Sequence, residues 1–250
     1  SCEVAACSND GDCDKGTFCD TQAGACVTPW EWYAPVVYLD TNENAPNPWW
    51  DYFTTVDYDG DWMAGNNWDN IDLFIQEAYV YSSFVKTDTH WYITYYYYFP
   101  VRWSTFGILG TQYENALRSV LLVVRQDGGK GILEVMETSS ENTFYRYLPE
   151  DSELKGLKDG TIKMDMASGH ARPIIYIEDQ THKITGNKNW DTDAGFPGDN
   201  GLVFRWASTP GVFPDGLIGE FNYSLVSMVD ELWTKRFDIG DMNVFDPFAK

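Results

Sequence analysis

The acidic residues Asp57, Asp59 and Asp61 alternate along one short polar segment of the chain. Carboxylates at alternate positions around a turn can direct their oxygens at a single Ca²⁺ ion. The segment is not an EF-hand loop, because Trp62 stands at the sixth position, where glycine is needed, and Trp68 at the twelfth, where glutamate is needed. The sequence therefore predicts either a calcium site at the three aspartates or a solvated acidic turn.

Histidine is the usual general base, and the chain has three: His90, His170 and His182. A Ser-His-Asp system needs one of them beside an activated nucleophile. The Gly-x-Ser-x-Gly elbow that presents such a serine is missing, as are a Walker motif and a Cys-x-x-Cys redox pair. We interpret each histidine as structural and predict no catalytic residue.

The cysteines are confined to the first 26 of the 250 residues: Cys2, Cys7, Cys13, Cys19 and Cys26. Residues between them are mostly polar and turn-forming, and so short a segment cannot build its own core. A disulfide-rich module is therefore favoured, and it implies an oxidising, extracellular or cell-surface location. A zinc knuckle is the alternative, but it would need closely paired cysteines.

Four of these cysteines can pair within the module, most simply as Cys7–Cys19 and Cys13–Cys26, although the sequence permits other pairings. Cys2 is then left over, either as an unpaired thiol or as a covalent link to another chain. The start at Ser1-Cys2 is interpreted as the end left after a leader is removed. We place the module at residues 1–28 and a second domain at residues 29–250.

The spacing from Cys7 to Cys26 resembles that of small Cys-rich modules in secreted bacterial proteins, such as those of myxobacteria. This resemblance covers about a tenth of the chain. It implies secretion and says little about activity.

The second domain consists of short apolar runs separated by Gly, Asn, Asp and Pro. Many short strands with turn signals between them are typical of an all-β sandwich or barrel. We predict an antiparallel β-sandwich with one late helix. The predicted strands are Leu73–Phe84, Trp91–Phe99, Ser119–Gln126, Gly131–Thr138, Thr143–Leu148, Pro173–Glu178 and Leu202–Trp206.

Two of these elements carry finer predictions. The strand Trp91–Phe99 is aromatic on both faces, so it should lie between layers or under a cover, and Pro100 should end its regular pairing. An apolar stripe from Leu225 to Trp233 predicts the late helix, with Asn222 or Ser224 as its N-cap.

Composition excludes several partners. The chain has 17 Lys and Arg against 38 Asp and Glu, a net charge of −21, which argues against nucleic acid and against anionic membranes. No run of 18 apolar residues occurs, so we predict no membrane span. The 14 Phe, 11 Trp and 16 Tyr provide ample apolar surface for a folded core.

Two longer motifs, Tyr92–Trp103 and Tyr113–Val124, resemble a secreted β-sandwich family that includes the necrosis-inducing-protein-like cytolysins and vacuolar-sorting-associated sandwich proteins. In that family a strand is followed by a His-x-Arg-Asp-Trp-like turn and by His-Glu-Asn-Asp-x-Glu-Gly. The later segments Arg172–Glu178 and Phe196–Phe204 resemble the family's later strands. The likeness spans residues 36–236.

The resemblance implies a divalent-metal site at the family's His, Asp and Glu positions. The corresponding residues here are Tyr113, Glu114, Asn115, Ala116, Arg118 and His182. Tyr113 stands where the family has its first His, Ala116 where it has Asp, and Arg118 where it has its last Glu. Because alanine cannot be a ligand and arginine repels a cation, we expect that the metal site is lost and the sandwich retained as a scaffold.

We predict from these features a secreted, non-enzymatic structural or interaction protein that self-associates into an oligomer or polymer. The alternatives are a glycan- or lipid-binding module, a metal-dependent hydrolase, and, by family resemblance, a cytolysin. Aromatic residues near the two ends are expected to meet a partner or a glycan: Trp30, Trp32, Tyr33, Trp49, Trp50, Phe245 and Phe248.

Overall fold

The computed structural model describes most of the chain: residues 6–41, 48–104, 111–140, 143–154, 156, 158–167, 169–186, 201–213 and 219–236. The predictions for Cys2, Phe245 and Phe248 lie outside these residues, as do the side chains of Trp49 and Tyr113.

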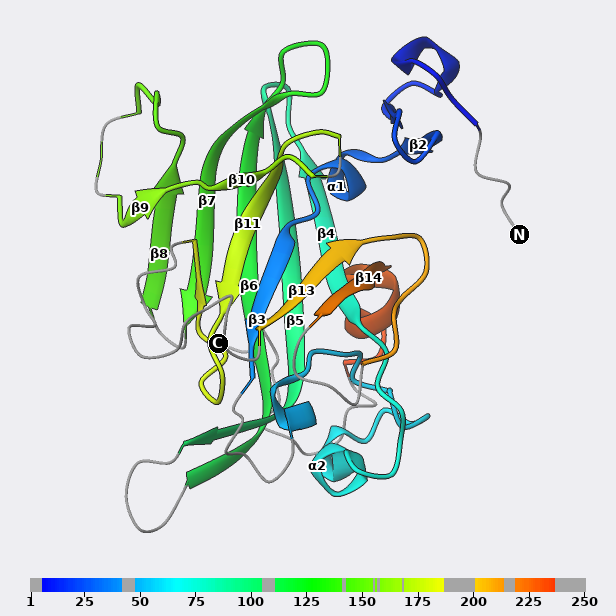
Figure 1. The fold of residues 1–250 in the computed structure, drawn as a ribbon, viewed down its shortest axis with the longest axis vertical. Coiled ribbons are helices and arrows are strands. Elements are labelled where there is room, and N and C mark those ends of the chain that lie inside the picture. Colours follow the sequence, from blue (N-terminus) through cyan, green and yellow to red (C-terminus); the bar gives the residue numbers. More distant parts are fainter. Residues whose placement is uncertain are drawn as a thin grey trace.

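The protein is built mainly from β-strands, which form a small sheet and a large one (Figure 1). The small sheet pairs β1, Phe18–Asp20, with β2, Ala25–Val27. The strands of the large sheet are β3 Val36–Asp40, β4 Tyr79–Lys86, β5 His90–Ser104, β6 Thr111–Arg125, β7 Ile132–Ser140, β8 Thr143–Leu148, β9 Gly160–Thr161, β10 Met164–Asp165, β11 Arg172–Ile177, β12 Ile184–Thr185, β13 Gly201–Trp206 and β14 Gly219–Ser227.

Helical segments are few and short in the described part. They comprise the α-helical turns α1 Pro29–Trp32 and α2 Asn67–Asn70, the 3-10 turns Asp10–Asp12, Pro48–Asp51 and Ala64–Asn66, and a π-helix at Met228–Trp233. None of these helices is long and apolar enough to cross a bilayer.

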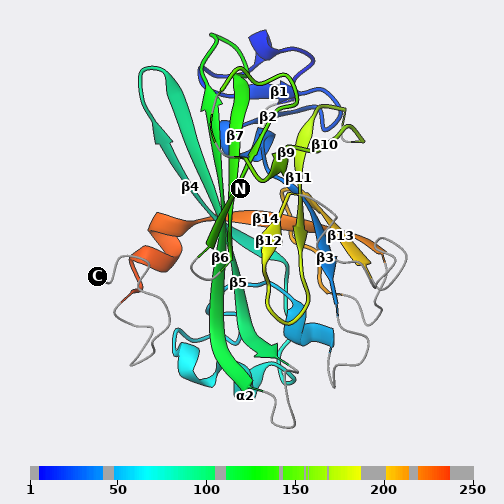
Figure 2. The same cartoon turned by 90° about the vertical axis from the view of Figure 1, so that its left-hand side faces the viewer.

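The large sheet has the order β10-β11-β3-β13-β14-β4-β5-β6-β7-β8-β9, and β12 pairs with β11. It folds back on itself, so that β3, β11 and β13 form one layer opposite β4 to β7 (Figure 2), and β12 contacts β6 and β7. The all-β class is confirmed. The long hairpins are antiparallel, whereas β3–β11, β13–β14, β14–β4 and β8–β9 are parallel pairs.

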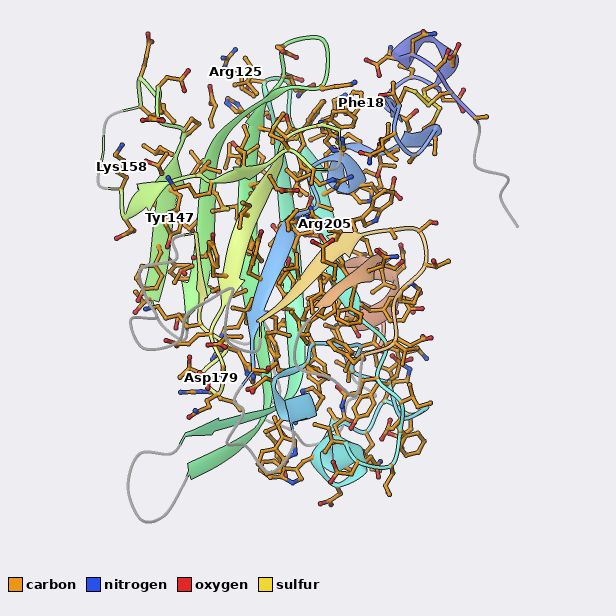
Figure 3. All side chains as sticks on the ribbon, in the orientation of Figure 1. Phe18, Arg125, Tyr147, Lys158, Asp179 and Arg205 are labelled. Atoms are coloured by element: carbon orange, nitrogen blue, oxygen red, sulfur yellow. A yellow bond between two sulfur atoms is a disulfide. The ribbon has the colours of Figure 1, made fainter. Side chains whose placement is uncertain are left out.

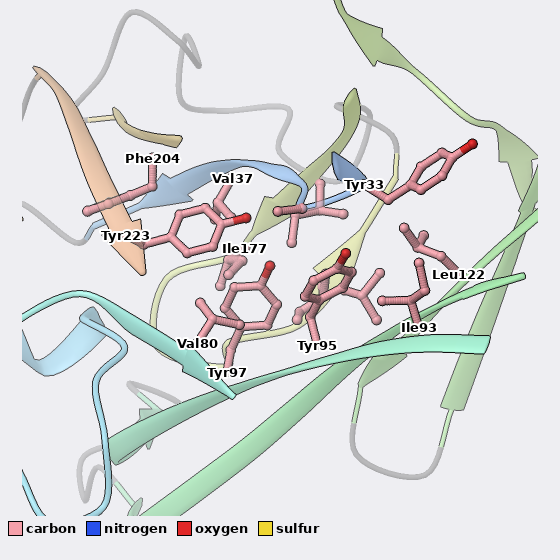
Figure 4. Close-up of a cluster of buried hydrophobic side chains, with 14 of the residues drawn as sticks. Tyr33, Val37, Val80, Ile93, Tyr95, Tyr97, Leu122, Ile177, Phe204 and Tyr223 are labelled. Carbon is pink, nitrogen blue, oxygen red and sulfur yellow. The ribbon is translucent and has the colours of Figure 1, made fainter. Parts of the chain in front are cut away.

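The prediction that β5 lies between layers or under a cover is confirmed for one face and for Tyr98 on the other, where Tyr92 is exposed and Tyr96 is half-buried. Tyr95, Tyr97 and Phe99 point into the main core, where Tyr95 and Tyr97 face Phe204 and Tyr223 from the opposite layer (Figure 4). On the other face, Tyr98 is buried in a second apolar cluster that includes residues of the π-helix. The aromatic residues on both faces of β5 thus join the two apolar clusters.

The pairing of β5 with β6 continues beyond Pro100, contrary to the prediction. The ladder omits only Pro100 and the opposing Asn115, and it resumes at Val101–Glu114. Proline has no backbone N–H to donate, and Asn115 adopts a left-handed conformation with φ 56°. A single missing pair is therefore accommodated without ending the strand.

The late helix begins later than predicted. Leu225 belongs to β14, where it pairs with Val80 of β4, so neither Asn222 nor Ser224 is the N-cap. Ser227 caps the π-helix, because its side chain accepts a hydrogen bond from the Asp230 N–H. Leu225 fits the helical spacing of apolar residues, but its segment forms a strand because it pairs with β4.

The disulfide module packs against the upper end of the large sheet. Its disulfides are Cys7–Cys19 and Cys13–Cys26, the simplest pairing predicted, and they are compatible with an extracellular location. Phe18 of the module meets Trp32 edge to face, with ring centres 6.0 Å apart (Figure 3).

The aromatic residues that follow the module are mostly buried, which differs from the expectation that they meet another chain. Trp32 and Tyr33 belong to the main core, and the Tyr33 hydroxyl donates to the Gly131 carbonyl oxygen at 2.9 Å. Trp30 and Trp50 are half-buried, and Trp50 packs near Trp68. These side chains attach the start of the second domain to the sheet.

Candidate functional site

The family-like residue His182 lies in a tight turn between β11 and β12, where its ring points into the core. Gln180 and His182 both have left-handed backbones, with φ 57° and 52°, which lets the turn reverse within a few residues. The imidazole stacks on Phe99 of β5, with ring centres 3.9 Å apart and planes at 1°. The residue is fully buried.

Asp51, at the end of a 3-10 turn, is the acidic partner of His182. Its Oδ1 lies 3.3 Å from His182 Nε2 and accepts a hydrogen bond from the Gln180 N–H at 2.7 Å. Both Asp51 and His182 have 0% solvent exposure. Substrate therefore cannot reach either group without rearrangement of the fold.

Arg118 of β6 completes what we call the core cluster: Asp51, Arg118 and His182. Its guanidinium donates to the carbonyl oxygens of Thr181 at 3.0 Å and Leu117 at 3.3 Å. Burial, with a further contribution from the charge of Arg102, lowers the pKa of Arg118 to about 10, which leaves it protonated at neutral pH. A fixed cation thus occupies the neighbourhood where the family resemblance implied a metal.

The histidine of the core cluster is neutral at pH 7. Burial lowers the pKa of His182, and the positive charges of Arg118 and Arg102 lower it further, whereas Asp51 acts in the opposite direction. Its Nδ1 and the Arg118 Nε find no hydrogen-bond partner among the described residues.

The other residues of the degenerate family site are not gathered around His182. Ala116 faces the main core, but Asn115 turns to the opposite face of the sheet, where it accepts from the Tyr98 hydroxyl and donates to the Ala64 carbonyl oxygen at 3.0 Å. Glu114 is exposed to solvent. The strand alternation thus divides the motif between two faces of the β5–β6 ribbon.

The predicted calcium ligands form a turn whose oxygens already accept hydrogen bonds. Asp61 accepts from the Met63 N–H at 2.6 Å and from Asn66 Nδ2 at 3.2 Å. Asp59 accepts from the Asp61 N–H at 3.2 Å and from Asn70 Nδ2 at 2.5 Å.

Across the described ranges, the sole trio of His, Cys, Asp or Glu side chains close enough to share an ion is Cys7, Cys13 and Cys19. All three of these cysteines are in disulfides. The calcium site at the three aspartates stays a prediction.

A second group of the same composition, which we call the seam cluster, lies between the disulfide module and the sheet: Asp20, His170 and Arg172. The Asp20 Oδ2 lies 3.7 Å from Arg172 Nη2 and 3.9 Å from His170 Nδ1. The His170 ring stacks on Trp32 at 3.7 Å, and its Nε2 lies 3.0 Å from the Trp32 carbonyl oxygen. Burial, followed by the charge of Arg172, lowers the pKa of His170.

The remaining histidine, His90, lies near the surface, with Nε2 3.2 Å from Glu134. Sequence reasoning missed Asp51 and the seam cluster. Asp51 lies 131 residues before His182, and no pattern in the sequence connects the two. The Asp20–Arg172 pair joins the two predicted domains and could not be found by considering each one separately.

No family model matches the chain, and no curated protein matches it. The chain spans about half the length of the solved structures that it resembles. A structure described as "Toxin fold for microbial attack and plant defense" has 17% identity, covering 44% of this chain and 46% of that one, with a TM-score of 0.30.

Two further structures have the same extent of likeness. The non-toxic HaNLP3 protein has 20% identity over 45% of this chain and 47% of its own, with a TM-score of 0.32. NLPPya in complex with mannosamine has 16% identity over 44% and 45%, with a TM-score of 0.28. The likeness to these necrosis-inducing-protein-like structures is distant and partial.

Proposed function

We propose that this protein is a secreted, non-catalytic interaction protein whose sandwich is a rigid scaffold. The observation that carries the proposal is the closed core cluster. Asp51 and His182 are fully buried, and the buried cation Arg118 donates to the carbonyl oxygen of Thr181, the residue before His182. A hydrolytic centre needs groups that reach its substrate, and a metal centre needs anionic or neutral ligands around an open position.

The alternative of a metal-dependent hydrolase can be tested directly at this cluster. We expect the Asp51→Asn variant to lose stability, while neither it nor the wild type hydrolyses glycan or ester substrates. Divalent metal is measured by mass spectrometry in protein purified without chelators. Glu137→Gln, which removes a half-buried partner of Arg146, is the matched control. Stoichiometric metal that disappears in Asp51→Asn but not in Glu137→Gln would refute the proposal.

Self-association is a second candidate function, favoured by an exposed apolar patch at Leu73, Phe74, Ile75 and Val212. Leu73 and Ile75 are 74% and 75% exposed, and a β-bridge between Glu77 and Val212 brings the two segments together. Apolar surface of this kind marks contact sites. The net charge of −21 opposes association at low salt, so screening should strengthen it.

Sedimentation velocity between about 20 and 300 mM salt tests the self-association. We expect larger species at the higher salt, and we expect Ile75→Ser to reduce them. Phe144→Ser, which changes an exposed apolar residue on β8, should have no effect. Association that weakens with salt, or that responds equally to the two substitutions, contradicts this function.

A further inference from the structure

A cavity of about 540 Å³ lies at the junction between the disulfide module and the large sheet. The module contributes one wall, including Asp20 and Cys26, and the strands β11, β13 and β14 contribute Arg172, Trp206 and Asn222. Figure 3 shows Arg205, another residue of this wall, near the upper end of β13. Ligand pockets in proteins commonly have volumes of about 300–1,000 Å³.

The buried Asp20 carboxylate keeps one oxygen without a hydrogen bond. Its Oδ1 accepts from the backbone N–H groups of Gln22 and Ala23, both at 3.1 Å. Its Oδ2 has the seam cluster's arginine and histidine as neighbours, but both lie beyond hydrogen-bond distance, at 3.7 and 3.9 Å. Asp20 is only 5% exposed and lines the cavity. This oxygen takes part in long ion pairs only, so it can still accept a hydrogen bond from a donor in the cavity.

Arg172 places a donor beside that acceptor. It is 3% exposed, and its Nη1 donates to the carbonyl oxygens of Glu31 at 2.7 Å and Ala34 at 3.2 Å. Its Nη2 has no hydrogen-bond acceptor within the described part of the chain. The cavity thus presents an acceptor and a donor 3.7 Å apart.

The rest of the wall offers an aromatic face and neutral polar groups. Trp206 is half-buried, and the Arg172 guanidinium lies 5.4 Å from the centre of its ring. The Trp206 indole N–H, the Asn222 amide and the Ser208 hydroxyl make no side-chain hydrogen bonds to residues that the structure describes. All three residues line the cavity.

The charged side chains that line the cavity favour an uncharged ligand. Two carboxylates, Asp20 and Glu31, and two guanidinium groups, Arg172 and Arg205, line the cavity, so their charges balance and an ion of either sign gains little net attraction. A neutral ligand with neighbouring hydroxyl groups matches the adjacent acceptor and donor, and the apolar face of a sugar ring matches an indole. We propose that this seam cavity binds one neutral pyranose unit of a glycan.

In the proposed complex the sugar ring lies against Trp206. One hydroxyl donates to Asp20 Oδ2, and its neighbour accepts from Arg172 Nη2. Asn222 and Ser208 contact further hydroxyls near the opening, where both are exposed. The inference rests on the proposed function, since it gives a ligand class to a non-catalytic interaction protein.

The test uses the full chain from a host without N-glycosylation, because Asn222-Tyr223-Ser224 fits the acceptor sequence for that modification. Cellobiose, maltose, lactose and chitobiose are the neutral probes, and glucuronic acid and glucosamine are the charged comparators. Binding is measured by saturation-transfer NMR and by titration of tryptophan fluorescence. We expect at least one neutral probe to bind and both charged comparators to bind more weakly.

Single substitutions test whether the sugar binds in the seam cavity. Trp206→Ala should weaken it by at least about tenfold, and Asp20→Asn should weaken it by a similar factor. Asn222→Trp, at an exposed position, should block the cavity without disturbing the core, and it serves if Trp206→Ala fails to fold. Trp233→Ala, which changes a half-buried tryptophan of the π-helix, is the matched control and should bind normally.

Three results would overturn the inference. They are no binding of any neutral probe up to about 10 mM, tighter binding of a charged comparator, and binding that survives both Trp206→Ala and Asn222→Trp. If no neutral probe binds, the proposed non-catalytic function is not refuted, because the protein could interact with a partner other than a glycan. Hydrolysis of a probe would instead refute the proposed function while keeping the cavity as its site.

Discussion

The core cluster and the seam cluster contain the same three residue types in different surroundings. In each, a histidine ring stacks on an aromatic residue: His182 on Phe99 at 3.9 Å, and His170 on Trp32 at 3.7 Å. The aspartate of the core cluster is enclosed by protein, whereas Asp20 of the seam cluster lines a cavity. Residue composition alone therefore does not identify a binding site. Access distinguishes the two clusters, because the unmatched atoms of the core cluster, His182 Nδ1 and Arg118 Nε, are enclosed, whereas the seam cluster borders a cavity.

The largest expected effect is the loss of stability in Asp51→Ala. Removing one member of a buried charged cluster costs about 3–5 kcal/mol, because the remaining groups are left without a partner in a dry environment. Asp20→Ala, beside the cavity, should cost about 1–3 kcal/mol, since solvent can reach the groups it leaves. Urea unfolding monitored by circular dichroism measures both. Equal losses would show that the two aspartates are equally enclosed.

Removal of the Cys13–Cys26 disulfide should affect the seam cluster and leave the core cluster unchanged. Closing a loop of this size, with a sequence separation of 13, stabilises a fold by about 3 kcal/mol. In Cys13→Ser/Cys26→Ser we expect faster amide exchange in β1 and near Asp20, and unchanged exchange around Phe99. Exchange that rises equally in both places would mean that the module and the sheet unfold as one unit.

The elements that could be predicted from the sequence have strong local patterns. The aromatic run Trp91–Phe99 specifies a strand with one fully buried face, and Asp127 begins a tight hairpin between β6 and β7. In that hairpin the Asp127 Oδ1 accepts from the N–H groups of Gly129 and Gly131, and both Gly128 and Gly131 have positive φ. Short-range chemistry is sufficient to define such elements.

The features that could not be predicted depend on contacts between distant segments. The strand β14 was interpreted partly as helix, because its apolar residues also fit a helical stripe, and only pairing with β4 decides between the two. The parallel pair β3–β11 joins segments about 140 residues apart. For the same reason the Asp51–His182 contact and the seam cavity leave no signal in the local sequence.

Acid should destabilise the protein through both histidines, and more strongly through the core cluster. Burial lowers the pKa of His182 and of His170 in the folded state below the ordinary value of 6.5. The unfolded chain therefore binds more protons as pH falls below about 6.5, and the stability present above that value is lost toward acid. Each histidine contributes at most about 1.4 kcal/mol per pH unit.

Melting temperatures between pH 5 and pH 8 measure this contribution. We expect His182→Gln to flatten the profile more than His170→Gln, because His182 is fully enclosed. Ser208→Ala, which changes an exposed residue without a titrating side chain, is the control and should leave the slope unchanged. A profile that stays equally steep in all three variants would assign the acid sensitivity to the carboxylates and would remove this distinction between the clusters.

Calcium is expected to have the smallest effect on stability. It tests whether the acidic turn at Asp57, Asp59 and Asp61, in which the oxygens of Asp59 and Asp61 are accessible but already hydrogen-bonded, can bind a ligand. Both oxygens of Asp59 and of Asp61 accept hydrogen bonds within their own turn, so an ion would have to displace donors already in place. We expect the melting temperature to change by less than about 1 °C between 2 mM calcium and 2 mM chelator, because a ligand shifts stability only when it binds the folded state. Asp57→Asn should respond in the same way. A melting temperature that rises clearly with calcium, and does not rise in Asp59→Asn, would show that a cation can displace hydrogen-bond donors from these oxygens. Occupied acceptors would then not exclude a binding site, and enclosure alone would do so.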